Sequence, residues 1–292
     1  MFNKILLPLD GSDMAESVIP YGEALARRLG SELVLIHACD ESHNLNHTMH
    51  RLYLEKRAEL VAEGFLSSAG EGQSPCVTAV TQFGELAPVI HDYVEQNGID
   101  LVIMVSGGLN ASAARPNSVA DDVFRVIGCP SMLVPPRAVA PGKPLFSQIL
   151  VPLDGTPGSE QALAPAAALA AASDAVITLF SMVKELVHSE PESDLVGDRG
   201  LYDIKGSLAA QEKTGEYLET LAWKMRDQGL DVDTRVDVGS DGAKLISAAA
   251  RVLAADMVVM ATTSRVSTWG VKSVTHKLLL AGDLPLLIVR QE

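Results

Sequence analysis

The chain has 292 residues, of which 47% are hydrophobic, and its formal net charge is −14. This length and apolar content suffice for two ordinary hydrophobic cores. The acidic balance argues against nucleic acid or anionic membrane as a partner, because phosphate surfaces reward clustered Lys and Arg. The N-terminus runs directly into a strand pattern and no apolar run reaches the length of a membrane span, so we expect a cytoplasmic protein.

The first half of the chain predicts alternating strands and helices. Short apolar runs without polar alternation are typical of strands buried on both faces of a parallel sheet. These runs predict strands at residues 5–9, 33–38, 77–82, 101–105 and 131–134. The segments between them predict helices at residues 16–29, 45–67, 86–96 and 119–126. Pro20 must lie in the first turns of its helix or kink it.

The second half of the chain repeats the first. The segment KILLPLDGS at residues 4–12 returns as QILVPLDGT at residues 148–156, and later landmarks follow at nearly the same offset. The repeat predicts strands at residues 149–153, 176–182, 232–238, 257–262 and 286–289 and helices at residues 159–172, 206–228, 243–253 and 274–281. The period exceeds that of solenoid repeats, so each copy is expected to be a complete α/β unit. Residues 184–200, rich in Glu, Asp, Pro and Gly, predict a solvated loop that copy one lacks.

This alternation of strands and helices predicts an α/β fold with two Rossmann-like domains, each a five-stranded parallel sheet flanked by helices. We expect domain 1 at residues 1–136, a linker rich in proline at residues 137–145, and domain 2 at residues 146–292. In doubly wound sheets, ligands bind beyond the carboxyl ends of the strands, where the winding reverses. The loops after the first and fourth strands of each copy are therefore the predicted sites.

Three motifs in each copy resemble the universal stress protein family. They are the Pro-Leu-Asp-Gly-Ser/Thr end of the first strand, a fourth strand such as Asp-Leu-Val-Ile-Met followed by a loop of small residues, and a Ser-Val pair that opens the last helix. The match spans the chain twice, so the chain is similar to a tandem member. The resemblance implies adenine nucleotide alpha hydrolase-like domains with strand order 3-2-1-4-5. It also implies an internal pseudo-dimer, paired through the fifth strands near residues 132–134 and 287–289.

The loop after the fourth strand of copy one partly matches the family's ATP binders, which carry Gly, two residues, Gly, nine residues, Gly and then Ser or Thr. Glycines let backbone N–H groups approach phosphate oxygens, and the hydroxyl lies at a helix N-terminus. Copy one keeps Gly108 in register, with Val105 and Asn117 at the other glycine positions and a spacer one residue short. A tight turn is the alternative explanation of Gly107-Gly108. The resemblance implies a candidate site for ATP or AMP in domain 1, formed by Pro8, Asp10, Gly107, Gly108, Asn117, Ser118 and Val119.

Copy two keeps no glycine in register, so the close approach of its backbone to phosphate is lost. Its weaker second site would consist of Pro152, Asp154, Thr262, Lys272 and Ser273. The aspartate of each copy matches the family's residue beside the adenosine moiety. Capping of a strand-to-helix turn explains an Asp before Gly equally well. The sequence thus predicts a degenerate pocket that is better kept in domain 1 than in domain 2.

Other motifs carry no catalytic pattern. Neither a GxxxxGK[ST] or GxGxxG loop nor a Ser-His-Asp arrangement occurs, so we expect no enzyme. The spacing of His43, His47 and His50 would align three imidazoles on one helix face, which raises a metal hypothesis beside the plainer one of a solvated polar face. Cys39 and its two fellow cysteines, at 76 and 129, form no CxxC pair and are expected to be buried and reduced.

Two classes of function remain open from the sequence. One is a non-enzymatic stress-response protein whose domain 1 loop binds ATP or AMP and regulates contacts with other proteins. The other is a pure interaction scaffold that has lost the nucleotide. Beyond the internal pairing of the two domains, a homodimer and protein partners of unknown identity are the expected partners, with no nucleic acid and no membrane.

Overall fold

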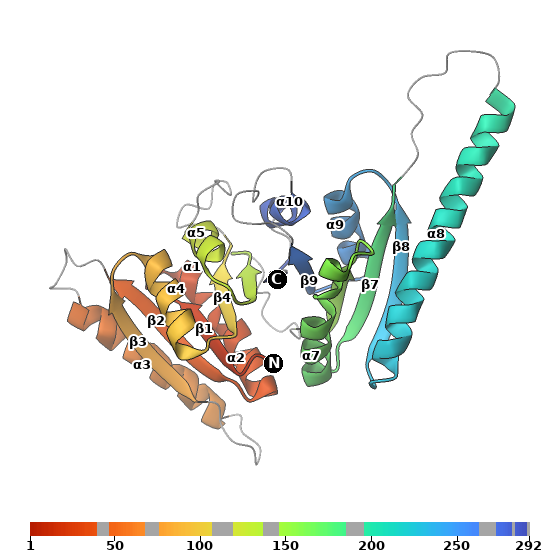
Figure 1. The fold of residues 1–292 in the computed structure, drawn as a ribbon. Coiled ribbons are helices and arrows are strands. Elements are labelled where there is room, and N and C mark those ends of the chain that lie inside the picture. The colour runs from red at the N-terminus through yellow and green to blue at the C-terminus, as the bar shows by residue number, and fades with distance from the viewer. Residues whose placement is uncertain are drawn as a thin grey trace. The chain divides into compact units, whose positions relative to one another are not determined.

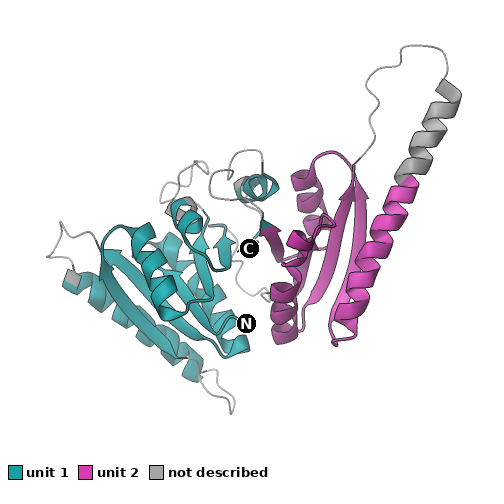
Figure 2. Ribbon diagram, viewed as in Figure 1, with its two compact units in different colours: residues 1–145, 262–292 teal, residues 146–261 magenta. Residues whose placement is uncertain are grey.

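The computed structural model describes residues 1–39, 47–67, 76–106, 119–136, 146–184, 196–262, 273–281 and 284–290. The chain forms two compact units (Figure 2). Unit 1 consists of Met1–Leu145 with Thr262–Glu292, and unit 2 of Phe146–Ala261. Within the described residues, no helix is both long and apolar enough to span a bilayer.

Unit 1 contains the first repeat (Figure 1). Its strands form a parallel sheet in the order β3-β2-β1-β4-β5, as the sequence predicted. These strands are β1 (Lys4–Pro8), β2 (Glu32–Cys39), β3 (Val77–Phe83), β4 (Leu101–Val105) and β5 (Ser131–Val134). The helices are α1 (Asp13–Glu16), α2 (Ile19–Leu29), α3 (His47–Ser67), α4 (Leu86–Asn97) and α5 (Val119–Val126).

Unit 2 contains most of the second repeat, and its strands lie in the order β9-β6-β7-β8, again with parallel pairing. The strands are β6 (Gln148–Pro152), β7 (Val176–Val183), β8 (Asp231–Val238) and β9 (Met257–Thr262), and the helices are α6 (Pro157–Glu160), α7 (Leu163–Ser173), α8 (Val196–Arg226) and α9 (Gly242–Val252). The first four strands of both copies therefore share one order, which confirms a duplicated Rossmann-like fold.

The last helix and strand of the second repeat, α10 (Val274–Ala281) and β10 (Leu286–Arg290), belong to unit 1. Strand β10 pairs antiparallel with β5, with Leu286 opposite Leu133 and Leu287 opposite Met132. The predicted pairing of the two fifth strands is confirmed. It satisfies backbone groups that would otherwise form an open sheet edge. Because of this pairing, the compact units divide the chain differently from the two sequence repeats.

Apolar strand interiors form the cores, as the short uncharged runs predicted. Ile5, Leu6 and Leu7 of β1 and the matching residues of β6 are fully buried. An aspartate just before the fourth strand of each copy binds the backbone at the start of the first strand, a contact that the sequence did not predict. The Asp100 carboxylate accepts hydrogen bonds from the backbone of Asn3 and Lys4, at 2.7 and 2.9 Å. It thereby fixes the start of β1.

In copy two, Asp256 anchors the start of β6 in the same way. Its Oδ2 accepts from the backbone N–H groups of Ser147, at 2.6 Å, and Gln148, at 3.3 Å. Burial raises the pKa of the Asp256 carboxyl, and these hydrogen bonds oppose the shift without cancelling it. Both repeats thus join their first and fourth strands by a carboxylate as well as by the sheet.

Three details of the predicted elements were wrong. The first helix of each copy is interrupted, with α1 ending at Glu16 and α6 at Glu160. A proline explains each interruption, because its ring clashes with the backbone carbonyl four residues earlier. Pro20 clashes in this way with Glu16, and Pro165 with Gln161. Helix α8 begins at Val196, inside the predicted loop of residues 184–200. Finally, Cys76 is exposed and Cys129 half-buried; all three cysteines are free thiols.

Candidate functional site

The turn after β1 combines a carboxylate, a left-handed glycine and a helix cap. Gly11 has φ +84°, a backbone conformation that residues other than glycine adopt only at a cost in energy. Asp10 Oδ1 accepts hydrogen bonds from the backbone N–H of Ser12, at 2.9 Å, and from its hydroxyl, at 2.6 Å. Ser12 Oγ in turn accepts from the backbone N–H of Ala15, at 3.1 Å, and caps α1. The capping explanation of this aspartate is therefore correct for one of its two carboxylate oxygens.

The turn after β6 repeats this geometry in copy two. Gly155 has φ +81°. Asp154 Oδ1 accepts from the backbone N–H of Thr156 at 3.0 Å and from its hydroxyl at 2.6 Å, and Thr156 Oγ1 accepts from Ser159 N at 3.2 Å. The two turns have kept the same local hydrogen bonds because the same Asp-Gly-Ser/Thr sequence specifies both.

Ser159 makes the two turns different. Its hydroxyl donates to Thr156 O, at 2.8 Å, and accepts from the backbone N–H of Asp154, at 3.3 Å. Burial opposes ionisation of the Asp154 carboxyl, but hydrogen bonds from Thr156 and Ser159 outweigh it and lower its pKa. Copy one has Ala15 at the position of Ser159, and none of the described residues accepts a hydrogen bond from the backbone N–H of Asp10.

A half-buried tyrosine contacts the helix that follows the copy-one turn. The Tyr53 hydroxyl of α3 donates to Glu16 Oε1 at 2.5 Å, and Arg57 forms an ion pair with Glu16 Oε2 at 2.5 Å. Burial raises the pKa of the Tyr53 hydroxyl, and its bond to the Glu16 carboxylate raises that pKa further. This cluster fixes α1 against α3, below the turn that carries Asp10.

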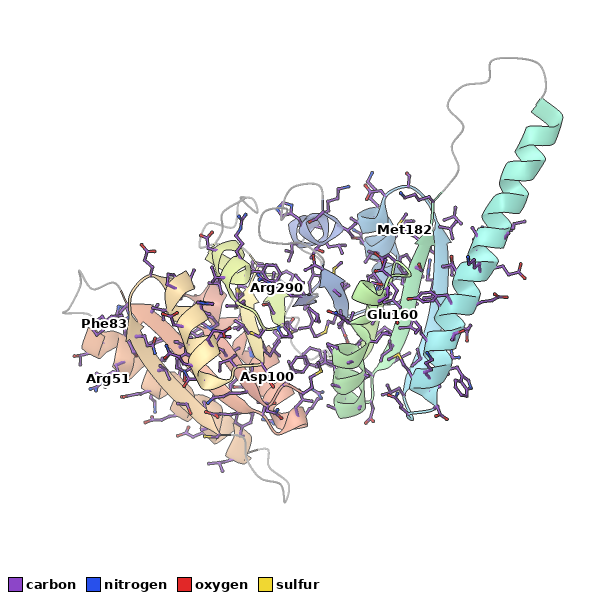
Figure 3. The ribbon with its side chains drawn as sticks, viewed as in Figure 1. Arg51, Phe83, Asp100, Glu160, Met182 and Arg290 are labelled. Carbon is purple, nitrogen blue, oxygen red and sulfur yellow. The ribbon has the colours of Figure 1, made fainter. Side chains whose placement is uncertain are left out.

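Copy two has the same tyrosine–glutamate hydrogen bond but no arginine at the position of Arg57. The Tyr217 hydroxyl of α8 donates to Glu160 Oε1, at 3.0 Å, and Figure 3 labels Glu160 at the end of α6. Burial and the Glu160 carboxylate raise the pKa of Tyr217 as well. Four residues further along the helix, the position of Arg57 is taken by the buried Leu221. Neither pair was predicted from the sequence, although a Glu and a Tyr recur at equivalent positions of the two copies.

The second predicted loop of copy one begins at the end of β4. Strands β1 and β4 pair directly, with Ile5 opposite Leu101, so both strands end at one edge of the sheet. Val105 ends β4, and the next residue donates from its backbone to Val134 O at 2.8 Å. Four of the predicted phosphate-loop residues, Gly107, Gly108, Asn117 and Ser118, lie outside the described residues. Val119 begins α5, where only the backbone is described.

The predicted second site is divided between the two units. Pro152 and Asp154 belong to unit 2, whereas Thr262 and Ser273 belong to unit 1. Ser273 Oγ accepts from the backbone N–H of His276 at 3.1 Å and so caps α10. Thr262 is buried at the end of β9, and Lys272 lies outside the described residues. Of the described members, Asp154 and Ser273 thus hold turns or caps, and Thr262 is buried.

One member of the predicted histidine cluster has a different role. His43 lies outside the described residues, and only the backbone of His47 is described. His50 of α3 stacks on His37 of β2, with ring centroids 4.4 Å apart and an interplanar angle of 19°. His37 is buried, and its Nδ1 donates to Leu9 O at 2.6 Å. The described residues contain no group of three or more side chains arranged to hold a metal ion.

Comparisons with known proteins agree with this architecture over the whole chain. The universal stress protein family matches residues 1–135 and again residues 145–290. The universal stress protein YxiE of Bacillus subtilis is 28% identical over 147 residues, which cover 46% of this chain and 99% of that protein.

Solved structures resemble the full length of the chain. A universal stress protein from Archaeoglobus fulgidus superimposes with a TM-score of 0.71 at 16% identity, with both chains covered completely. A putative universal stress protein from Pseudomonas aeruginosa gives a TM-score of 0.65 at 15% identity, covering 99% of this chain and 94% of that one. At such identities the likeness concerns the fold. Since the family itself matches both halves, the chain belongs to the universal stress protein family and carries two copies of its domain.

Proposed function

We propose that this protein is a non-enzymatic tandem universal stress protein of the cytoplasmic stress response. Copy one binds an adenine nucleotide, ATP or AMP, at the edge of the sheet where β1 and β4 end, and copy two does not. Nucleotide binding changes the contacts of the protein with other proteins. The pairing of β5 with β10 supports an internal pseudo-dimer of the two copies.

One observation carries the choice between the copies, namely the hydrogen-bonding state of the two turns. Among the described residues, the hydrogen bonds to the Asp10 side chain all fall on Oδ1, which leaves Oδ2 to accept from a ribose hydroxyl. The backbone N–H of Asp10 is without an acceptor among the described residues, whereas that of Asp154 is satisfied by Ser159. A ligand oxygen in copy two would have to displace this bond. A ligand oxygen in copy one can accept from the Asp10 N–H without displacing an acceptor among the described residues.

The phosphate loops favour the same copy. Copy one keeps Gly107 and Gly108 after β4, and copy two has Thr263 and Ser264 there. Glycine lets backbone N–H groups approach a phosphate closely, and a Cβ at the same place prevents this. Since neither sequence motifs nor the described site present a nucleophile, a general base and a metal ligand in one place, we propose binding without hydrolysis.

The experiment compares two matched variants of the full chain, Asp10→Asn and Asp154→Asn. ATP affinity is measured by isothermal titration calorimetry, and AMP affinity in the same way. Loss of a hydrogen bond to a charged group costs about 1.5–3 kcal/mol, so we expect the dissociation constant of Asp10→Asn to rise about tenfold or more. Asp154→Asn should bind like the wild type. Equal losses in the two variants, or a loss in Asp154→Asn alone, would place the nucleotide elsewhere.

A second arm tests the loop itself. Gly108→Leu should abolish binding while Ser264→Leu in copy two leaves it unchanged. Heat denaturation of the purified wild type, followed by assay of the supernatant for ATP, ADP and AMP, shows whether nucleotide is carried through purification. A wild type that neither retains nor binds nucleotide would support the scaffold without nucleotide instead.

A further inference from the structure

The edge strands of the two copies, β3 and β8, differ in charge. In unit 1, β3 pairs with β2, and in unit 2, β8 pairs with β7. No other described strand pairs with either of them. Figure 1 shows β3 and β8 each at the border of its own sheet, with α3 and α8 packed against one face. Each strand therefore has one backbone edge that no strand of its own unit covers.

The hydrogen bonds to β2 show which groups of β3 point outward. Leu33 N donates to Cys76 O, at 2.8 Å, and Gly84 N donates to Cys39 O, at 2.9 Å. In a parallel pair the backbone groups of alternate residues point to opposite sides of the strand. The backbone groups of even-numbered residues in β3 therefore face β2. Those of Val77, Ala79 and Thr81 face the open edge.

The exposed edge of β3 carries no charge. Its sequence is VTAVTQF, with high β propensity and no ionisable side chain. The sequence of β8 is DVDTRVDV, with three aspartates and one arginine, a net charge of −2. Natural edge strands are commonly guarded against pairing with another chain by charged side chains. Strand β8 has this protection and β3 lacks it.

The difference falls on equivalent positions of the two copies. Leu33 lies opposite Val77 and Ile177 opposite Val232, in the same place of each sheet. The register then matches three uncharged residues of β3 with three charged ones of β8. These pairs are Thr78 with Asp233, Val80 with Arg235, and Gln82 with Asp237. Charged side chains on this edge strand were therefore either gained in copy two or lost from copy one after the duplication.

We propose that the β3 edge is a homodimer interface, at which a second copy of this chain adds its own β3 in antiparallel register about a two-fold axis at Val80. This register places Val80 opposite its symmetry mate, Ala79 opposite Thr81, and Thr78 opposite Gln82. The outward backbone groups of Ala79 and Thr81 then bond to each other across the axis. β-branched and polar neighbours face each other with no like charges opposed.

Charge makes β8 unsuitable for the same contact. The equivalent register would place Arg235 opposite Arg235 and Asp233 opposite Asp237, and like charges directly opposite destabilise a strand pair. The whole chain has a net charge of −14, so two copies repel each other over most of their surfaces. An uncharged edge is where that repulsion is locally smallest. The contact is symmetric and closes at two chains, because each chain offers one such edge.

The first test transfers the pattern of β8 to β3. The variant Thr78→Asp/Val80→Arg/Gln82→Asp carries residues that the same fold already holds at the equivalent places of copy two. Sedimentation velocity of the full chain should show a dimer for the wild type. For the variant we expect a monomer, with a dissociation constant raised at least about tenfold. Circular dichroism checks that the variant is folded. A monomeric wild type, or a folded variant that remains dimeric, overturns the proposal.

The reverse exchange predicts a gain of association. Asp233→Thr/Arg235→Val/Asp237→Gln gives each chain a second unguarded edge. Two self-complementary edges on one chain link dimers into open chains, so this variant should form species larger than a dimer. Absence of larger species in a folded variant would show that charge does not control these edges.

Disulfide trapping decides the register and does not depend on the triple variants. In a Cys76→Ser background, Val80→Cys places one thiol beside its symmetry mate, in a pair with closely spaced Cα atoms. Mild oxidation should convert it to a covalent dimer. The matched control is Arg235→Cys in the same background, which should remain a single chain. Equal trapping at both positions, or none at position 80, contradicts the proposed interface.

Discussion

The turn after β1 and the turn after β6 form the most informative comparison in the molecule. Both hold Asp, Gly and Ser or Thr with nearly identical hydrogen bonds, so this motif is maintained by the fold. They differ in what surrounds the motif. Copy one has Arg57 beside the Tyr–Glu pair, and its Asp10 backbone N–H has no acceptor among the described residues, whereas in copy two Ser159 accepts from the Asp154 N–H. Duplication therefore separates residues that maintain the fold from residues that are available to a ligand.

The largest expected difference in stability concerns His37 of β2 and its counterpart in β7, the residues that follow Ile36 and Phe180. Copy one has His37 there and copy two has Ser181, and both are buried. We expect His37→Ala to lower the free energy of unfolding by about 3 kcal/mol, because it removes a hydrogen bond and a stacked ring and leaves a cavity. Ser181→Ala should cost about 1 kcal/mol. Urea unfolding followed by circular dichroism measures both. If the two costs were equal, the stack with His50 would contribute no stability.

The next largest effects are expected at Glu16 and Glu160, the glutamates that bind the two tyrosines. Glu16→Gln should reduce the free energy of unfolding by about 2 kcal/mol, since it leaves the partly buried Arg57 without its counter-charge. Glu160→Gln should cost about 1 kcal/mol, because Tyr217 loses only a charged acceptor. The same urea titration compares them. The double variant Glu16→Gln/Arg57→Leu, which also removes the unpaired cation, should recover part of the loss, and no recovery would refute the role given to the cation.

The two glycines should behave alike. Gly11→Ala and Gly155→Ala each place a Cβ in the left-handed region, at a cost of about 1 kcal/mol in the free energy of unfolding. A Cβ on Gly11 would lie 3.9 Å from the Tyr53 ring, an ordinary contact, and nothing lies within 4 Å of one on Gly155. Steric crowding therefore adds nothing to either variant. Unfolding midpoints that differ clearly would show that the turns are less equivalent than their hydrogen bonds indicate.

The smallest expected effect is a dependence on acid. The pKa of Asp154 is lowered in the folded protein, so its ionised form stabilises the fold at pH values above the ordinary pKa of 3.8. That contribution is lost as the pH falls through the lowered value. Asp154→Asn should therefore lose about 0.5 kcal/mol of unfolding free energy at about pH 6, and match the wild type at about pH 2. Urea midpoints at both pH values test this, and a deficit that persists in acid would point to a loss of packing.

Much of the fold could be predicted from the sequence. The strands needed only apolar runs of the right length, and the fifth-strand pairing needed only the family resemblance. Pro20 was correctly recognised as a constraint, but its clash with the carbonyl of Glu16 ends one helix and a second one begins at Ile19. The start of α8 was missed, because the composition around Val196 is typical of loops.

The candidate site was less predictable, for a physical reason. Asp10 and Asp154 occupy identical local sequences, and their difference arises from Ser159 and Ala15, five residues after each aspartate. The Tyr53 and Glu16 contact joins residues 37 positions apart, so no local motif encodes it. The contrast between β3 and β8 is visible in the sequence but has meaning only once both strands are known to be edges.

The most direct test of the account is the number of nucleotides bound per chain. Native mass spectrometry of the full chain, titrated with ATP and separately with AMP, counts them without assuming a site. The account predicts that binding saturates at one nucleotide per chain and that Asp10→Asn removes it. Two nucleotides per chain, or one that survives Asp10→Asn and disappears in Asp154→Asn, would contradict the unequal roles of the two copies.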